Sequence, residues 1–278
     1  MSRGGWFDIR IRIHLLFWAV MGLSVVTGHF LEVITLFVIV LIHEMGHVAM
    51  ARELGWTVTE VQLLPFGGVA TMEDSYATDP LDEIVVALAG PFLNVVMMAI
   101  SYLFWYGNVW SEEWARFFLV SNATIALFNL LPIWPLDGGR ILQAMLCWVL
   151  PYRSAAILSM TGSTLLAGIL VGFSCLDVKV NVLVIGIYLL TVNIQSFMRF
   201  PYHFFRFLME KYVRQPDEHA VHALRVQPQE TVLSVSHKLR RGYSHLLYVQ
   251  GTGLLPEERL LHALLFEQKH DAKVGTLL

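Results

Sequence analysis

The sequence predicts an all-α polytopic membrane bundle of about six transmembrane helices with a membrane-dipping β-hairpin, followed by a small soluble α+β module. Of its 278 residues, 56% are hydrophobic and only 15% are charged, which is too apolar for an ordinary soluble domain. The mean hydropathy is +0.58. The apolar residues gather between positions 13 and 198 in runs long enough to cross a bilayer, whereas charged residues return after Arg199. We therefore expect lipid around most of the chain.

Six apolar runs are candidate membrane spans, at residues 13–30, 31–51, 84–105, 116–131, 155–176 and 181–198. The first run follows several arginines but reaches Thr27 and Gly28 without the small-residue cleavage site of a signal peptide, so we expect it to remain as a span. Six spans place both termini on one side. The basic residues on that side are Arg3, Arg10, Arg12, Arg52, Arg140, Arg153, Arg199 and Arg206, against Arg116 and Lys179 opposite. The positive-inside rule then predicts cytoplasmic termini.

The connection at residues 56–71 reads WTVTEVQLLPFGGVAT, which is rich in β-branched residues and contains a Pro-Phe-Gly-Gly turn signal. This pattern predicts a β-hairpin. Its tip, with Phe66 and Gly67, is too apolar for a watery loop, so we expect it to dip into the membrane domain beside a cavity or a partner. An extended substrate could then add to the free edge of the hairpin. The alternative is a hairpin that caps the bundle without touching substrate.

The C-terminal region alternates strand and helix patterns. Residues 221–226 and 245–249 are typical of strands and residues 232–241 and 257–266 of helices, with a turn at 251–253. We expect a linker at residues 201–218, with a hinge around Pro216. The predicted division is therefore a transmembrane metal-site domain at 1–200, the linker, and a soluble module at 219–278.

The motif His43-Glu44-Met45-Gly46-His47 has the spacing of a metal site on a helix. Residues four apart return to nearly the same helix face, so His43 and His47 can bind one ion, and imidazole nitrogen suits zinc. Glu44 is then placed to act as general base toward a water molecule on the metal. Such a pentapeptide occurs by chance in roughly one chain of this length in a hundred, so its context must decide.

That context is a membrane span, because the apolar run VITLFVIVLI at residues 33–42 leads directly into the motif. Ionisable side chains at such a depth are costly and mark functional sites. A structural His–Glu pair satisfied by neighbouring helices would also place these residue types here. Two further functions are open to such a chain, a metal-ion or proton transporter and a non-catalytic membrane scaffold. The sequence does not show the related halves that are common in transporters.

A catalytic zinc usually takes three protein ligands, so a third must come from elsewhere in the chain. Glu32, Glu73 and Asp137 are the acidic residues near the membrane that qualify. Asp137 lies in the sequence PIWPLDGG, whose prolines and glycines predict broken backbone, and such backbone is expected at membrane depth only where it lines a cavity. We therefore expect Asp137 to be the third ligand.

Several motifs together resemble one family. They are HEMGH at 43–47, LPFGG at 64–68, Ala89-Gly90-Pro91 with Asn94, and NLLPIWPLDGG at 129–139. Over about residues 10–200 the chain resembles the site-2 protease family of intramembrane zinc metalloproteases. Because the chain is short, has no PDZ insertion and carries a C-terminal module, it resembles the sporulation branch in particular, the stage IV sporulation factor B-like pro-sigma-factor proteases.

This resemblance implies a zinc-dependent endopeptidase with His43, His47 and Asp137 as ligands of one zinc ion and Glu44 as the base. It places Asn129 and Pro135 on the substrate path, to which the hairpin argument adds Phe66 and Gly67. Asn129 can equally satisfy a broken helix end. The resemblance further implies a pro-sigma-factor substrate, inhibitory membrane partner proteins and regulated intramembrane proteolysis during sporulation. The C-terminal module would face the mother-cell cytoplasm at the forespore membrane.

The C-terminal module resembles a single cystathionine-β-synthase (CBS) motif, which implies regulation by adenine nucleotides and self-association into a homo-oligomer. The usual Gly-x-x-Thr-x-x-Asp of such motifs is absent where residues 254–257 read LLPE. The net charge of -3 gives no global basic field, so we expect no nucleic-acid partner. The expected partners are membrane lipid and protein.

Overall fold

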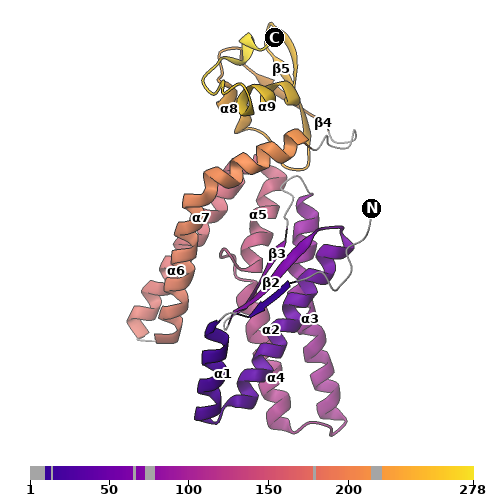
Figure 1. The fold of residues 1–278 in the computed structure, drawn as a ribbon, viewed down its shortest axis with the longest axis vertical. Coiled ribbons are helices and arrows are strands. Elements are labelled where there is room, and N and C mark those ends of the chain that lie inside the picture. Colours follow the sequence, from indigo (N-terminus) through magenta and orange to yellow (C-terminus); the bar gives the residue numbers. More distant parts are fainter. Residues whose placement is uncertain (1–9, 14, 65–66, 73–78, 178–179, 214–220) are drawn as a thin grey trace. The chain divides into compact units, whose positions relative to one another are not determined.

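The computed structural model describes residues 10–13, 15–64, 67–72, 79–177, 180–213 and 221–278. The chain is mostly helical, with two small sheets (Figure 1). It divides into two compact units. The first contains α1, α2, α4, the first sheet, most of α3 and the start of α5, and the second contains the rest of α5, α6, α7 and the C-terminal module.

The helices of the first unit are α1 (Leu15–Thr27), α2 (Phe30–Glu53), α3 (Pro80–Tyr106) and α4 (Glu112–Asn129). The break between α1 and α2 lies at Gly28, whose φ of 79° is a conformation that favours glycine. Ser111 caps α4 by accepting a hydrogen bond from the Trp114 N–H, which satisfies one of the free donors at the helix start. Local sequence thus accounts for the end of α1 and the start of α4.

The first sheet has the order β1-β2-β3, formed by Arg10–Ile13, Val58–Leu64 and Gly67–Met72. Strands β2 and β3 are antiparallel, with Leu64 paired to Gly67, so the predicted hairpin is confirmed (Figure 1). Strand β1 pairs in parallel with β2 and was not predicted. The tip residues 65–66, and with them Phe66, lie outside the described residues. Whether the hairpin dips into the membrane stays a prediction.

The second unit adds α5 (Asp137–Val149), α6 (Tyr152–Asp177) and α7 (Val180–Val213). Helices α6 and α7 run side by side (Figure 1). By length and composition, four helices of the described chain can cross a membrane, namely α2, α3, α6 and α7. This confirms an integral membrane protein with several apolar helices. Helix α1 is apolar but short, and α4 begins with two acidic residues, so the count of six spans stays a prediction.

Helix α7 extends well beyond the predicted span at 181–198 and the predicted linker start at 201. It passes through Pro201 and ends at Val213, because a proline removes only one backbone donor and the following turns are held by packing. Phe204, Phe207 and Leu208 of this extension belong to the buried core of the C-terminal module. Residues 201–213 are therefore helix instead of linker, while the hinge around Pro216 lies outside the described residues.

The C-terminal module consists of β4 (Val221–Val226), α8 (Val232–Ser236), β5 (Ser244–Val249), β6 (Gly253–Pro256), α9 (Glu257–Leu265) and a 3-10 turn at Val274–Thr276. Strand β5 pairs in parallel with β4 and antiparallel with β6. The predicted strands and helices are present, although α8 is shorter than expected. Strand β6 was missed because it is only four residues long and starts at a glycine that was assigned to the turn.

A buried ion pair joins the module to the first turn of α3 within the second unit. The Arg241 guanidinium donates to the Glu83 carboxylate, and both side chains are largely buried. Removing one partner of a buried pair leaves an uncompensated charge, which typically costs about 3–5 kcal/mol. We expect Arg241→Met to lower the thermal unfolding temperature in detergent, and the double variant Arg241→Met with Glu83→Leu to recover much of the loss. A single variant as stable as the wild type would contradict this role of the pair.

A second polar cluster surrounds Lys211 in the same unit. The Lys211 ammonium donates to the Tyr243 carbonyl at 2.7 Å and to Glu257 Oε1 at 2.6 Å. His245 Nε2 accepts from the Arg240 backbone N–H at 3.2 Å, so its proton is on Nδ1, which lies 3.1 Å from Glu257 Oε2. His245 is therefore held as a neutral imidazole between a donor and an acceptor.

The His245 imidazole makes the module sensitive to acid. Burial lowers the pKa of His245 below its ordinary value of 6.5, and Lys211 and His222 lower it further against the opposing effect of Glu257. Below about pH 6.5 the unfolded state then binds more protons than the folded state, so the free energy of unfolding falls as the solution is acidified. We expect the unfolding temperature to drop between pH 7 and pH 5. His245→Asn should reduce that drop, whereas His270→Asn, at an exposed position, should not.

Candidate metal centre

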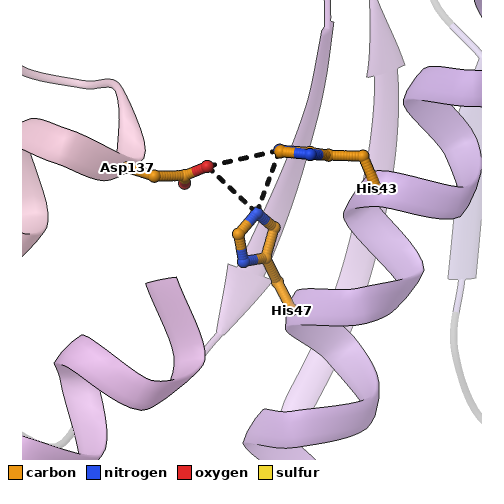
Figure 2. Close-up of side chains that lie close together, drawn as sticks. All are labelled: His43, His47 and Asp137. Carbon is orange, nitrogen blue, oxygen red and sulfur yellow. Dashed lines mark hydrogen bonds and ion pairs between the residues drawn. The ribbon is translucent and has the colours of Figure 1, made fainter. Parts of the chain in front are cut away.

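His43 and His47 lie one turn apart on α2, and both side chains are buried. Their Nε2 atoms are 3.2 Å apart. Asp137, the first residue of α5, brings its Oδ2 atom to 3.2 Å from His43 Nε2 and 3.3 Å from His47 Nε2. Figure 2 shows the three side chains pointing toward a common point. Within the described chain, this is the group of His, Cys, Asp and Glu residues whose ligand atoms converge, all within 4.8 Å of one another.

The hydrogen bonds of the surrounding residues decide which atoms of His43, His47 and Asp137 are available to bind a metal. His47 Nδ1 lies 2.8 Å from the Val86 carbonyl oxygen, which can only accept, so Nδ1 carries a proton and, in the neutral ring, Nε2 is the atom that can bind a metal. Asp137 Oδ2 is buried, and the polar atoms that face it among the described residues are the two Nε2 atoms, at 3.2 and 3.3 Å. Neutral imidazole nitrogens and a carboxylate oxygen this close together repel one another unless a proton or a metal cation lies between them. The arrangement therefore fits a bound metal.

The distances fit zinc in particular. Zinc binds imidazole nitrogen and carboxylate oxygen at about 2.0–2.2 Å in tetrahedral sites, which puts neighbouring ligand atoms about 3.3 Å apart. The three separations are 3.2, 3.2 and 3.3 Å. Two imidazoles and one carboxylate also form a ligand set known from catalytic zinc sites, in which the fourth position is open to water or substrate.

Gly90 on α3 makes room for both histidines. A Cβ at this position would overlap His47 Nε2 and would lie 2.8 Å from His43 Cε1. Gly46 plays a related part on α2, because a Cβ there would lie 2.8 Å from the Ala89 carbonyl oxygen. The two glycines let α2 and α3 approach closely. The sequence motifs contained both residues, but only the structure shows what they do.

The two glycines after Asp137 allow the start of α5 to pack closely against the backbone of the preceding loop. A Cβ on Gly138 would overlap the Leu130 carbonyl, and one on Gly139 would lie 2.7 Å from Trp134 N. Asn193 of α7 supports the loop by donating to the Trp134 carbonyl oxygen at 2.6 Å. Sequence reasoning missed Asn193, since nothing local distinguishes it from other polar residues of an apolar helix.

The other predicted site residues lie outside the three-residue group. Glu44 is half-buried on α2, beside His43 in the sequence. Asn129 is the last residue of α4, Pro135 is exposed in the loop before α5, and Gly67 begins β3. Glu32, considered as a ligand, instead lies near the exposed His29, while Glu73 lies outside the described residues.

Fold and site together define an intramembrane metalloprotease, and comparison with known proteins agrees. The chain matches the model of Peptidase family M50 over residues 31–109 and 107–170, and it belongs to that family. It is 30% identical to "Stage IV sporulation protein FB" of Bacillus subtilis over 98% of both chains. It is therefore a zinc-dependent membrane protease, which replaces the transporter and scaffold hypotheses.

Two further relatives come from Methanocaldococcus jannaschii. A zinc metalloprotease of this organism is 28% identical over 65% of this chain and 54% of its own length. The solved structure titled "Site-2 Protease from Methanocaldococcus jannaschii" has a TM-score of 0.55 at 26% identity, covering 69% of this chain and 92% of that one. The resemblance to the site-2 protease family is thus confirmed.

Proposed function

We propose that His43, His47 and Asp137 hold one zinc ion and that Glu44 is the general base for hydrolysis of a peptide bond in or near a membrane-associated segment. The observation that carries this proposal is the convergence of two imidazole Nε2 atoms and a carboxylate oxygen with separations of 3.2–3.3 Å. Bound zinc would supply a Lewis acid that polarises the scissile carbonyl and makes a coordinated water more acidic. Glu44 takes the proton of the attacking water and passes it to the leaving amine.

The substrate must be extended at the point of cleavage, because a helix hides its amides in its own hydrogen bonds. Strand β2 is paired on both sides, by β1 and β3, so an added strand would use the outer edge of β1 or β3. We infer that substrate pairs along β3 and passes Phe66, Gly67, Asn129 and Pro135. Pairing at a strand edge binds the substrate through its backbone, so sequence specificity must come from the side chains beside that edge.

For the biological substrate we infer a membrane-associated precursor of a sigma factor. The support is the similarity to the Bacillus subtilis sporulation protein over 98% of both chains, which includes the C-terminal module. Six spans with cytoplasmic termini would place this module in the mother-cell cytoplasm at the forespore membrane. In this setting, inhibitory membrane proteins would control regulated intramembrane proteolysis.

We infer that the module acts as a CBS-like unit that associates with a second copy. Its sheet exposes an apolar outer face that includes Leu246, Tyr248 and Leu254, with Tyr248 paired directly to Leu254. Such a face is suited to packing against another sheet. Adenine nucleotide is not part of the proposal, because Glu257, near the position of the missing ribose-binding acid, is already bonded to Lys211 and His245.

Co-expression with candidate sigma-factor precursors tests this function. The wild type should shorten its precursor, and the His43→Ala variant should leave it intact although it is present in the membrane. In purified form, the wild type should carry about one zinc per chain, and a chelator should stop cleavage. Cleavage that persists in His43→Ala, or in zinc-free protein, would contradict the assignment.

A further inference from the structure

Asn94 of α3 is fully buried and lies against the metal centre without belonging to it. Its Oδ1 atom is 2.9 Å from His43 Nδ1, on the side of the ring opposite the ligand atom. Its Nδ2 atom donates to the backbone carbonyl of Asn122 on α4 at 3.1 Å. One amide side chain therefore joins the helix that carries the zinc ligands to two other helices of the first unit.

The Asn122 carbonyl fixes which way the amide points. A carbonyl oxygen can only accept, so the NH₂ end of Asn94 must face α4 and the Oδ1 end must face α2. Oδ1 is also only an acceptor, so His43 Nδ1 must carry the imidazole proton. In the neutral ring the Nε2 atom of His43 is then bare, and it is directed toward His47 and Asp137. The tautomer of the ligand follows from a carbonyl on a third helix.

From this geometry we propose that Asn94 is the positioning residue that holds His43 in its zinc-binding tautomer and ring orientation, an inference that rests on the proposed zinc site. A hydrogen-bond acceptor on Nδ1 makes Nε2 a better donor to metal, and removing such a partner typically weakens metal binding about 10–100-fold. The two ligands differ here. His47 is oriented by the Val86 carbonyl, which no substitution removes, whereas His43 depends on a side chain.

The competing explanation is that Asn94 serves only as a hydrogen bond between helices. The variant Asn94→Asp distinguishes the two roles. It keeps the hydrogen-bond acceptor that faces His43 but loses the donor that faces the Asn122 carbonyl. A positioning role predicts that Asp retains zinc, since a carboxylate accepts the Nδ1 proton at least as well. If Asn94 only joins the helices, Asn94→Asp should lose as much zinc affinity as Asn94→Leu.

Asn122→Leu is the matched control. The Asn122 side chain is also fully buried, and it donates to Phe118 O within its own helix, while its Oδ1 has no partner among the described residues. Leucine removes this amide but leaves the backbone carbonyl that Asn94 uses. If both variants lose zinc affinity equally, the loss is due to the removal of a buried amide. Any additional loss of zinc affinity in Asn94→Leu is due to the effect on His43.

The test measures zinc affinity by competition with a chelator, and the visible spectrum after Co²⁺ replaces zinc, in full-length protein in detergent. We expect Asn94→Leu to bind zinc about 10–100-fold more weakly with a changed Co²⁺ spectrum. Asn94→Asp and Asn122→Leu should stay within about threefold of the wild type with an unchanged spectrum.

Equal zinc affinity and equal Co²⁺ spectra in Asn94→Leu and Asn122→Leu would overturn the inference. If Asn94→Leu does not fold, a folded Asn94→Asp that loses zinc affinity by about tenfold or more while Asn122→Leu keeps it would overturn it as well. A wild type without zinc would instead overturn the proposed metal centre itself. The failure of the inference and the failure of the proposed function therefore give different results.

Discussion

Glu44→Gln will abolish measurable peptide cleavage while the protein keeps its zinc. Glutamine has the shape of glutamate but cannot take the proton of the attacking water, and general-base catalysis contributes about 10²–10⁴-fold to rate. The three proposed ligands, His43, His47 and Asp137, are unchanged. The measurement is cleavage of a co-expressed precursor together with the zinc content of the purified protein.

Glu53→Gln is the matched control for this variant, because it neutralises an exposed acid at the end of the same helix. It should cleave like the wild type. Wild-type turnover by Glu44→Gln would exclude Glu44 as the base. Loss of zinc together with activity in this variant would instead assign Glu44 a role in binding the metal.

Gly90→Ala will remove both zinc and activity, although it adds only one methyl group. The new Cβ would overlap His47 Nε2 and press on His43 Cε1, so neither imidazole could keep its place. The overpacking itself costs typically about 1–3 kcal/mol, which leaves room for a folded protein without a metal site. We expect near-zero zinc content and no detectable cleavage in a variant that still reaches the membrane.

Gly162→Ala provides the comparison, since Gly162 is also helical but an added Cβ there meets nothing within 4 Å. This control should retain zinc and activity. Full zinc occupancy in Gly90→Ala would show that the ligand positions differ from those described, and would count against the close packing of Gly90 on the two histidines.

The sequence predicted the parts of this protein that depend on local patterns. Apolar runs predict α2, α3 and α6, and the spacing of His43 and His47 predicts a shared face because helical periodicity is a local property. Alternating residues with Gly and Pro turns predicted the hairpin and the strands β4 and β5. Asp137 was singled out because broken backbone in an apolar region has few explanations, and the structure places it beside the two histidines.

What was missed depends on partners far away in the chain. Strand β1 has only four residues, and it forms through backbone pairing with the distant strand β2, in the register that sets residue 10 opposite residue 60. The link between Arg241 and Glu83 spans 158 residues, and that between His43 and Asn94 spans 51. Helix α7 continues past Pro201 because its last turns pack into the core of the module. None of these features has a local pattern that a single sequence could reveal.

The metal centre formed by α2 and α5 can be examined directly by X-ray absorption at the zinc edge of the purified protein. We predict about one zinc per chain, bound by two imidazoles and by oxygen at about 2.0–2.2 Å, with the metal lost in Asp137→Ala. A sulfur ligand at about 2.3 Å, or zinc retained with the same spectrum in Asp137→Ala, would contradict the site built from His43, His47 and Asp137.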